Sequence, residues 1–142
     1  MLRPRRSVAP IAALLLTAWL IPERASAQAC LPYEPDTVRI AGVLEQLTFP
    51  GPPHYQSITN GDRPQTGFYL RLATSICTIA SPDYEAKTGV KLVQLVLDSL
   101  GFATLRPQLG RSVTLAGTLS AAHAASHHAP ILLTAVEPDS AR

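Results

Sequence analysis

Four histidines lie in two polar stretches of the sequence, outside its apolar runs. His54 belongs to a Pro-rich stretch, and His123, His127 and His128 lie together much later in the chain. Imidazole binds Zn²⁺ and Cu²⁺ well, and the spacing of the last three would let at least two rings meet one ion. A zinc or copper site formed by these four residues is therefore one hypothesis. The alternative is four exposed loop histidines, since no Cys, Asp or Glu lies beside them to complete a site.

Two tyrosines and a guanidinium form a second candidate site. Tyr69 and Arg71 alternate with apolar residues, and Tyr55 lies in the Pro-rich stretch. Aromatic rings and an arginine can stack on a sugar or a base, so Tyr55, Tyr69 and Arg71 are candidate ligand-binding residues. The alternative is that Tyr69 and Arg71 form the solvated face of an ordinary strand.

Familiar catalytic motifs are missing from the sequence. It contains no Gly-x-Ser-x-Gly, no Gly-rich phosphate loop and no His-Glu-x-x-His, and Ser126 beside His127 is only a sequence neighbour. We therefore expect a binding protein rather than an enzyme, with no cofactor other than the zinc or copper considered above.

The first residues have the pattern of a signal peptide. Three arginines precede an apolar stretch over 8–21, and Ala25-Ser26-Ala27 supplies the small residues that a signal peptidase reads. We predict cleavage between Ala27 and Gln28, which makes 1–27 the leader. The apolar stretch is too short for a permanent membrane span, so no stable anchor is expected. Arg5-Arg6 leaves the twin-arginine export route as an alternative to the general secretory route.

Removal of the leader changes the charge of the chain. The precursor carries a net charge of +2, whereas eight basic and nine acidic residues remain after cleavage. A nearly neutral domain lacks the basic surface that phosphate contacts require, so we expect no nucleic-acid partner. We expect the mature protein to be periplasmic or secreted.

Two cysteines, Cys30 and Cys77, survive the predicted cleavage. An even number of cysteines in a short exported chain indicates a structural disulfide, because the compartment favours oxidation. Lipidation of Cys30 is the alternative, but Ala27-Gln28-Ala29 is a poor match to the usual lipoprotein box.

The positions of these residues depend on five predicted strands and one short helix. Residues 28–142 suit a single domain, which we expect to be monomeric. Alternating or continuous apolar patterns predict strands over 37–47, 67–73, 90–97, 113–119 and 131–136. Residues 98–110 contain Phe102, Leu105 and Leu109 at helical spacing before Gly110, and Pro107 limits the helix to one or two turns.

The resulting order of elements, β-β-β-α-β-β, predicts an all-β protein with one short helix. It is the order of a five-stranded oligonucleotide/oligosaccharide-binding (OB) barrel, so we expect an OB-like barrel. The first and fourth predicted strands share the pattern Val-x-(Ile/Leu)-Ala-Gly-x-Leu, with glycines at Gly42 and Gly117. In such a barrel these two strands are neighbours, and glycine suits the bend that closes the cylinder. Chance similarity of two alternating strands is the alternative.

The OB arrangement would bring the two polar stretches together. Loops 49–66 and 120–130 would flank one binding face, so we expect a small ligand or a metal to bind between them. Alternatively, the Pro-rich segment 49–55 would bind a protein of the cell envelope, as an interaction or inhibitor domain, since prolines hold an extended shape at little entropic cost.

Several segments resemble one known protein family. They are Cys30-Leu31-Pro32-Tyr33-Glu34-Pro35, Thr48-Phe49-Pro50-Gly51-Pro52-Pro53-His54-Tyr55, Gln94-Leu95-Val96-Leu97, His127-His128 and Pro130-Ile131-Leu132-Leu133-Thr134. Together they resemble an uncharacterised exported bacterial family, the domain of unknown function 4431. The resemblance implies export and a compact β domain, and it implies no particular activity.

Overall fold

The structure, a computed structural model, describes residues 29–138 and the side chains as far as Thr134. The predicted leader and its cleavage site at Ala27 and Gln28 lie outside these residues. Within the described part, no helix is long and apolar enough to cross a membrane.

Five strands and one short α-helix make up the described chain, so the all-β class is confirmed. The elements are β1 (Thr37–Pro50), β2 (Pro64–Ile76), β3 (Val90–Val96), α1 (Ser99–Leu105), a 3₁₀ helix (Arg106–Gln108), β4 (Ser112–Ala121) and β5 (Ile131–Pro138). Asp98 caps α1 by accepting a hydrogen bond from the backbone of Gly101 at 2.7 Å. The predicted helical stretch is thus an α-helix that ends at Leu105, two residues before Pro107, followed by a short 3₁₀ helix that contains Pro107.

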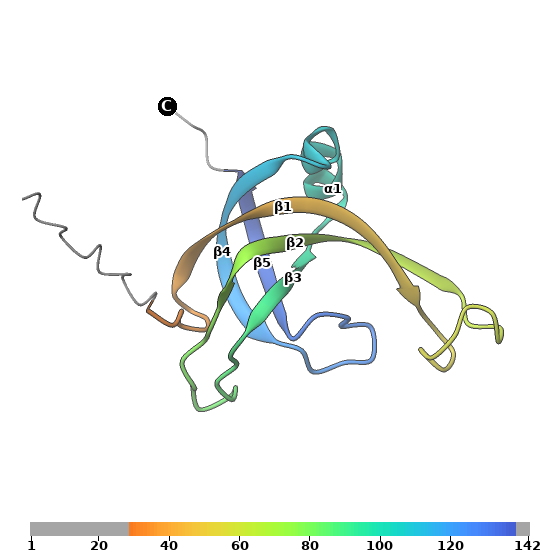
Figure 1. The fold of residues 1–142 in the computed structure, drawn as a ribbon, viewed down its shortest axis with the longest axis horizontal. Coiled ribbons are helices and arrows are strands. Elements are labelled where there is room, and N and C mark those ends of the chain that lie inside the picture. The colour runs from red at the N-terminus through yellow and green to blue at the C-terminus, as the bar shows by residue number, and fades with distance from the viewer. Residues whose placement is uncertain (1–28, 139–142) are drawn as a thin grey trace, which may run out of the picture.

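The strands form one closed barrel in the order β1-β2-β3-β5-β4 (Figure 1). β1 closes it by pairing with two strands: its first half pairs with β4 and its second half with β2, both antiparallel. β3 and β5 pair in parallel. The β1–β2 hairpin extends beyond the rest of the barrel (Figure 1).

The predicted pairing of the first and fourth strands is confirmed. Ile40 lies opposite Leu115, and Gly42 lies opposite Val113. A Cβ atom at Gly42 would lie 2.9 Å from the carbonyl oxygen of Arg71 on β2. Glycine therefore permits the close approach of backbones at the point where β1 passes from one partner strand to the other.

Alternating residues of all five strands fill the barrel. Each strand contributes at least one side chain with no exposed surface, among them Leu44, Leu70, Val93, Leu115 and Leu133. Phe102 of α1 packs edge-on against Phe68 with ring centroids 5.0 Å apart, so the helix covers one end of this core.

The predicted disulfide between Cys30 and Cys77 is confirmed. Beside it, the backbone N–H of Leu31 donates to the carbonyl of Cys77 at 2.8 Å. The hydroxyl of Tyr33, a buried residue, donates to the carbonyl of Glu85 at 2.9 Å. The segment before β1 is thus fastened to the β2–β3 connection by covalent and hydrogen bonds together.

Candidate functional site: a cavity between β2 and β3

The β1–β2 loop is shorter than the sequence predicted. Both strands extend into the expected loop, and Pro50 pairs with Pro64 at the end of the hairpin. The remaining loop, residues 51–63, is organised around the carboxylate of Asp62. That carboxylate is almost completely buried and accepts hydrogen bonds from the backbone N–H groups of His54 (2.9 Å), Gln56 (2.7 Å) and Ser57 (2.8 Å).

These hydrogen bonds favour the ionised form of Asp62. The backbone donors of Ser57 and Gln56 contribute most, and they lower the pKa of Asp62 to about 2. The Nδ1 atom of His54 lies 3.3 Å from the same carboxylate, although His54 is mainly exposed. Asp62 is the only acidic residue of the predicted loop, a signal that could have indicated its role.

The loop between β4 and β5, residues 122–130, folds over the outer face of β3 and β2. The side chain of Gln94 on β3 fastens it, since Nε2 donates to the carbonyl of Ser126 (3.2 Å) and Oε1 accepts from the backbone N–H of His128 (2.7 Å). The His128 ring stacks on Phe49 of β1 at 4.7 Å, and its Nε2 lies 3.1 Å from Oε1 of Gln65. The 122–130 loop therefore contacts the β1–β2 hairpin near its loop end, beside the Pro50–Pro64 pair.

Tyr69 lies beneath this loop instead of facing water. It points to the outer face of β2, between the core residues Phe68 and Leu70, yet only 1% of it is exposed. The Phe49 ring lies 5.4 Å from the Tyr69 ring, and burial raises the pKa of the hydroxyl. The alternative that Tyr69 forms a solvated face does not hold, because alternation gives the direction of a side chain and not what covers it.

A cavity of about 250 Å³ lies beside Tyr69, where β2 and β3 separate. We call it the β2–β3 cavity. Its polar lining residues are Gln65, Thr66, Tyr69, Gln94, Ser126 and His127, and its apolar ones include Leu97 and Phe102. Strands, helix and the 122–130 loop all contribute, so residues far apart in sequence meet here.

The Tyr69 ring packs closely against Gly67. A Cβ atom at Gly67 would lie 3.3 Å from Cε2 and 3.5 Å from the hydroxyl oxygen of Tyr69. Gly67 itself lines the β2–β3 cavity, so the hydroxyl lies at the cavity wall. Within the described residues this hydroxyl has no hydrogen-bond partner. Every fully buried side-chain N or O atom of these residues has a partner, so the hydroxyl oxygen of Tyr69 must be partly accessible. It is therefore open to the cavity.

His127 has a defined tautomer when it is neutral. Its Nδ1 accepts hydrogen bonds from the backbone N–H groups of His123 (3.1 Å) and Ala124 (3.2 Å), so the ring proton must be on Nε2. Burial lowers the pKa of His127, with smaller contributions from His123 and His128. The neutral form, a hydrogen-bond donor through Nε2, is thus favoured near pH 7.

The four histidines do not assemble into the suggested metal centre. His123 and His127 contact each other edge-on at 4.6 Å, whereas His128 contacts Phe49 and Gln65, and His54 contacts Asp62. Among residues 29–138, no three His, Cys, Asp or Glu side chains are grouped so that they could hold a metal ion.

The other two predicted ligand residues do not line the β2–β3 cavity either. The Nε of Arg71 donates to both carboxylate oxygens of Glu45 at 2.9 Å, an exposed cross-strand pair. Tyr55 lies in the β1–β2 loop with a positive φ of 58°. Of the three candidates, only Tyr69 belongs to this cavity.

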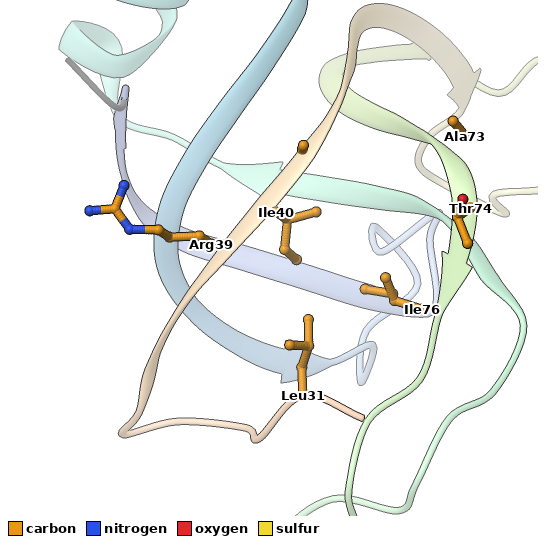
Figure 2. A pocket seen from close by; sticks show the side chains of 7 residues that line it. Leu31, Arg39, Ile40, Ala73, Thr74 and Ile76 are labelled. Carbon is orange, nitrogen blue, oxygen red and sulfur yellow. The ribbon is translucent and has the colours of Figure 1, made fainter. Parts of the chain in front are cut away.

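A second cavity, of about 290 Å³, lies where β1 and β2 separate. Figure 2 shows Leu31, Ile40 and Ile76 pointing toward it from three segments, while the Arg39 side chain points away. We call it the β1–β2 cavity. Binding sites combine an apolar surface with a few converging polar groups, so the β2–β3 cavity is the better candidate.

Comparison with protein families gives a match over the last third of the chain. Residues 92–138 match the family model of a domain of unknown function, DUF4431. The match confirms the resemblance for the part of the chain from β3 to β5, which supplies Gln94, Ser126 and His127. The segments around Cys30 and Pro50 lie outside the DUF4431 match. Comparisons with curated proteins and with solved structures gave no significant match.

Proposed function

We propose that this chain is an exported OB-like barrel that binds a small molecule in the β2–β3 cavity, between the two loops predicted as 49–66 and 120–130. The observation that carries the proposal is the Tyr69 hydroxyl. It belongs to a residue that is only 1% exposed, it has no partner among the described residues, and it borders a cavity. A polar group so placed gains a hydrogen bond when a ligand enters.

The OB-like assignment rests on topology. The closed order β1-β2-β3-β5-β4, the parallel β3–β5 pair and the helix between β3 and β4 all suit it. In OB barrels the outer face of strands 2 and 3, flanked by the loops after strands 1 and 4, is the usual binding surface. The β2–β3 cavity lies on that face.

A screen by nuclear magnetic resonance tests the binding proposal. A mixture library of small uncharged and charged metabolites would be added to the ¹⁵N-labelled mature protein. We expect at least one compound to shift the Gly67 amide and the side-chain amides of Gln65 and Gln94. The amides of Ala41, Ala73 and Thr74, which line the β1–β2 cavity, are the internal control. A library that shifts no resonance of the β2–β3 cavity contradicts the proposal.

Export is proposed from the leader pattern and is compatible with the disulfide, which oxidising compartments favour. Expression of the full chain in a bacterial host, followed by fractionation and mass measurement, tests it. We expect the periplasmic or secreted product to begin at Gln28. A product that keeps residues 1–27 in the cytoplasm would exclude export, and added acyl mass at Cys30 would show lipidation instead.

A second candidate function is contact with an envelope protein through the Pro-rich segment 49–55. It is favoured by the projecting hairpin (Figure 1) and by Asp62, which preorganises the loop. Preorganisation lowers the entropic cost of binding. Crosslinking in envelope extracts should lose a specific partner when Pro52, Pro53 and Tyr55 are changed to Ala, and should keep it when Arg71 is changed to Ala.

A further inference from the structure

The β2–β3 cavity has no charged wall. Among the described residues that line it there is no Lys, Arg, Asp or Glu, and the one histidine has a pKa that burial lowers. A charged ligand would lose its hydration in this cavity without meeting an opposite charge, which is strongly unfavourable. An uncharged ligand avoids this cost.

The hydrogen-bonding groups at the cavity are mainly donors. The Nε2–H of neutral His127 and the amide nitrogen of Gln65 are donors, since the Oε1 of Gln65 already faces His128. The Tyr69 hydroxyl can donate or accept. By contrast, the Thr66 hydroxyl is paired with the Thr48 hydroxyl at 2.7 Å. A complementary ligand therefore presents several oxygen acceptors, at least one of which can also donate.

Part of the lining is apolar. Leu97 and Phe102 are partly buried hydrophobic residues that pack against the core, and both border the cavity. The cavity volume of about 250 Å³ is below the range of roughly 300–1,000 Å³ typical of sites for drug-sized molecules. The ligand is thus compact, with one apolar surface and one edge rich in oxygen.

These features together describe one chemical class. We propose that the β2–β3 cavity binds a single uncharged sugar ring, with its C–H face against Leu97 and Phe102 and its hydroxyl groups toward Tyr69, Gln65 and His127. This inference rests on the proposed function and adds the ligand class and the residue that selects it. The Tyr69 hydroxyl is the selecting group, because it has no hydrogen-bond partner among the described residues and borders the cavity.

Matched sugars test the ligand class. Glucose, galactose and N-acetylglucosamine are the neutral probes, and glucuronate and galacturonate are the charged counterparts of the first two. Titration into ¹⁵N-labelled protein at pH 7.5 should give shifts at Gly67, Gln65 and Gln94 with at least one neutral sugar. We expect the charged counterparts to bind at least tenfold more weakly.

Tyrosine variants test the selecting group. Tyr69→Phe removes only the hydroxyl and keeps the ring against Phe49, and we expect it to weaken binding of the neutral sugar three- to tenfold. Tyr84→Phe is the control, because its hydroxyl bonds Glu34 away from the cavity. Unchanged affinity in Tyr69→Phe would overturn the role of Tyr69.

The remaining outcomes separate this inference from the proposed function. Equal or tighter binding of the charged sugars would overturn the ligand class. Absence of sugar binding, when another compound of the library does occupy the cavity, would overturn this inference and leave the proposed function standing. A cavity that no compound enters would overturn both.

Discussion

The backbone N–H of His128 donates to Oε1 of Gln94 at 2.7 Å, while Nε2 of the same amide donates to Ser126. One side chain of β3 thus pairs with two peptide groups of the 122–130 loop. The loop covers Tyr69 and supplies part of the β2–β3 cavity. The integrity of the candidate site therefore depends on a residue that is itself neither aromatic nor charged.

Replacement of Gln94 by Ala should release the loop. It removes both hydrogen bonds and leaves a backbone N–H without a partner, which should lower the free energy of unfolding by about 1–3 kcal/mol. Hydrogen exchange of the His128 amide should become faster, as measured by nuclear magnetic resonance. Gln46→Ala, at an exposed position of β1, is the control and should leave that amide protected. Equal protection in both variants would show that Gln94 does not fasten the loop.

Replacement of Asp62 by Asn should loosen the 51–63 loop. An amide cannot accept all the hydrogen bonds that the carboxylate accepts from His54, Gln56 and Ser57. We expect faster hydrogen exchange at these three amides and unchanged exchange at β3. Asp36→Asn, in the exposed turn before β1, is the control.

The wild-type loop should also be sensitive to strong acid. The pKa of Asp62 is lowered from 3.8 to about 2, so the folded chain holds its ionised form more strongly than the unfolded chain does. The stabilisation is complete above pH 4 and is lost as the pH falls through about 2. Protection of the Gln56 amide should decrease over that range. A constant protection factor between pH 4 and 2 would contradict the assigned role.

The 122–130 loop should weaken in mild acid because of His127. Burial lowers the pKa of His127 below its ordinary value of 6.5, so the unfolded chain takes up the proton first. Stability is therefore complete above pH 6.5 and falls as the pH decreases toward the folded pKa. A protonated Nδ1 can no longer accept from His123 and Ala124. We expect lower protection factors for both amides at pH 5 than at pH 7.5.

A variant separates this effect from general acid lability. His127→Asn supplies an oxygen that can accept backbone hydrogen bonds and does not titrate, so protection of Ala124 should become independent of pH. His54→Asn, in the other loop, should keep the wild-type pH dependence. If the His127 variant keeps it too, another group causes the change.

Removal of the disulfide should destabilise the whole domain. A Cys30→Ser, Cys77→Ser variant frees a loop of 47 residues, and we expect a loss of about 2–4 kcal/mol in urea denaturation. The Leu31 and Ile79 amides, which bond across the same junction, should exchange faster. Unchanged stability after removal of both cysteines would show that the hydrogen bonds of Leu31, Tyr33 and Thr78 suffice.

Much of the fold could be predicted from the sequence, because it depends on alternation and on glycine. The repeated pattern around Gly42 and Gly117 predicted the contact of the first and fourth strands. The ends of β1 and β2 were missed because proline normally interrupts a strand. Here Pro50 and Pro64 form the last pair of the hairpin, where the loss of backbone donors is tolerated.

The candidate site was only partly predictable. The 122–130 loop does contact β1 and β2 beside the other loop, through Phe49 and Gln65. The histidines, however, were expected to gather, and they instead contact Phe49, Asp62 and one another. Gln65 and Gln94 were missed because an amide in a strand has no distinctive sequence pattern. Whether Tyr69 is exposed to solvent or buried depends on how the 122–130 loop folds back over the sheet. The local periodicity of β2 does not encode this.

The bond between Cys30 and Cys77 encloses β1 and β2 but excludes β4, although β1 pairs with both β2 and β4. In the oxidised chain, β1 and β2 lie within one loop that the disulfide closes, whereas Thr37 must still pair with Thr118, which is distant in the sequence. Because contacts distant in sequence form slowly, we expect oxidation to accelerate the pairing of β1 with β2 more than the pairing of β1 with β4. Closure of the barrel by β4 and β5 is then the step that the disulfide leaves slow.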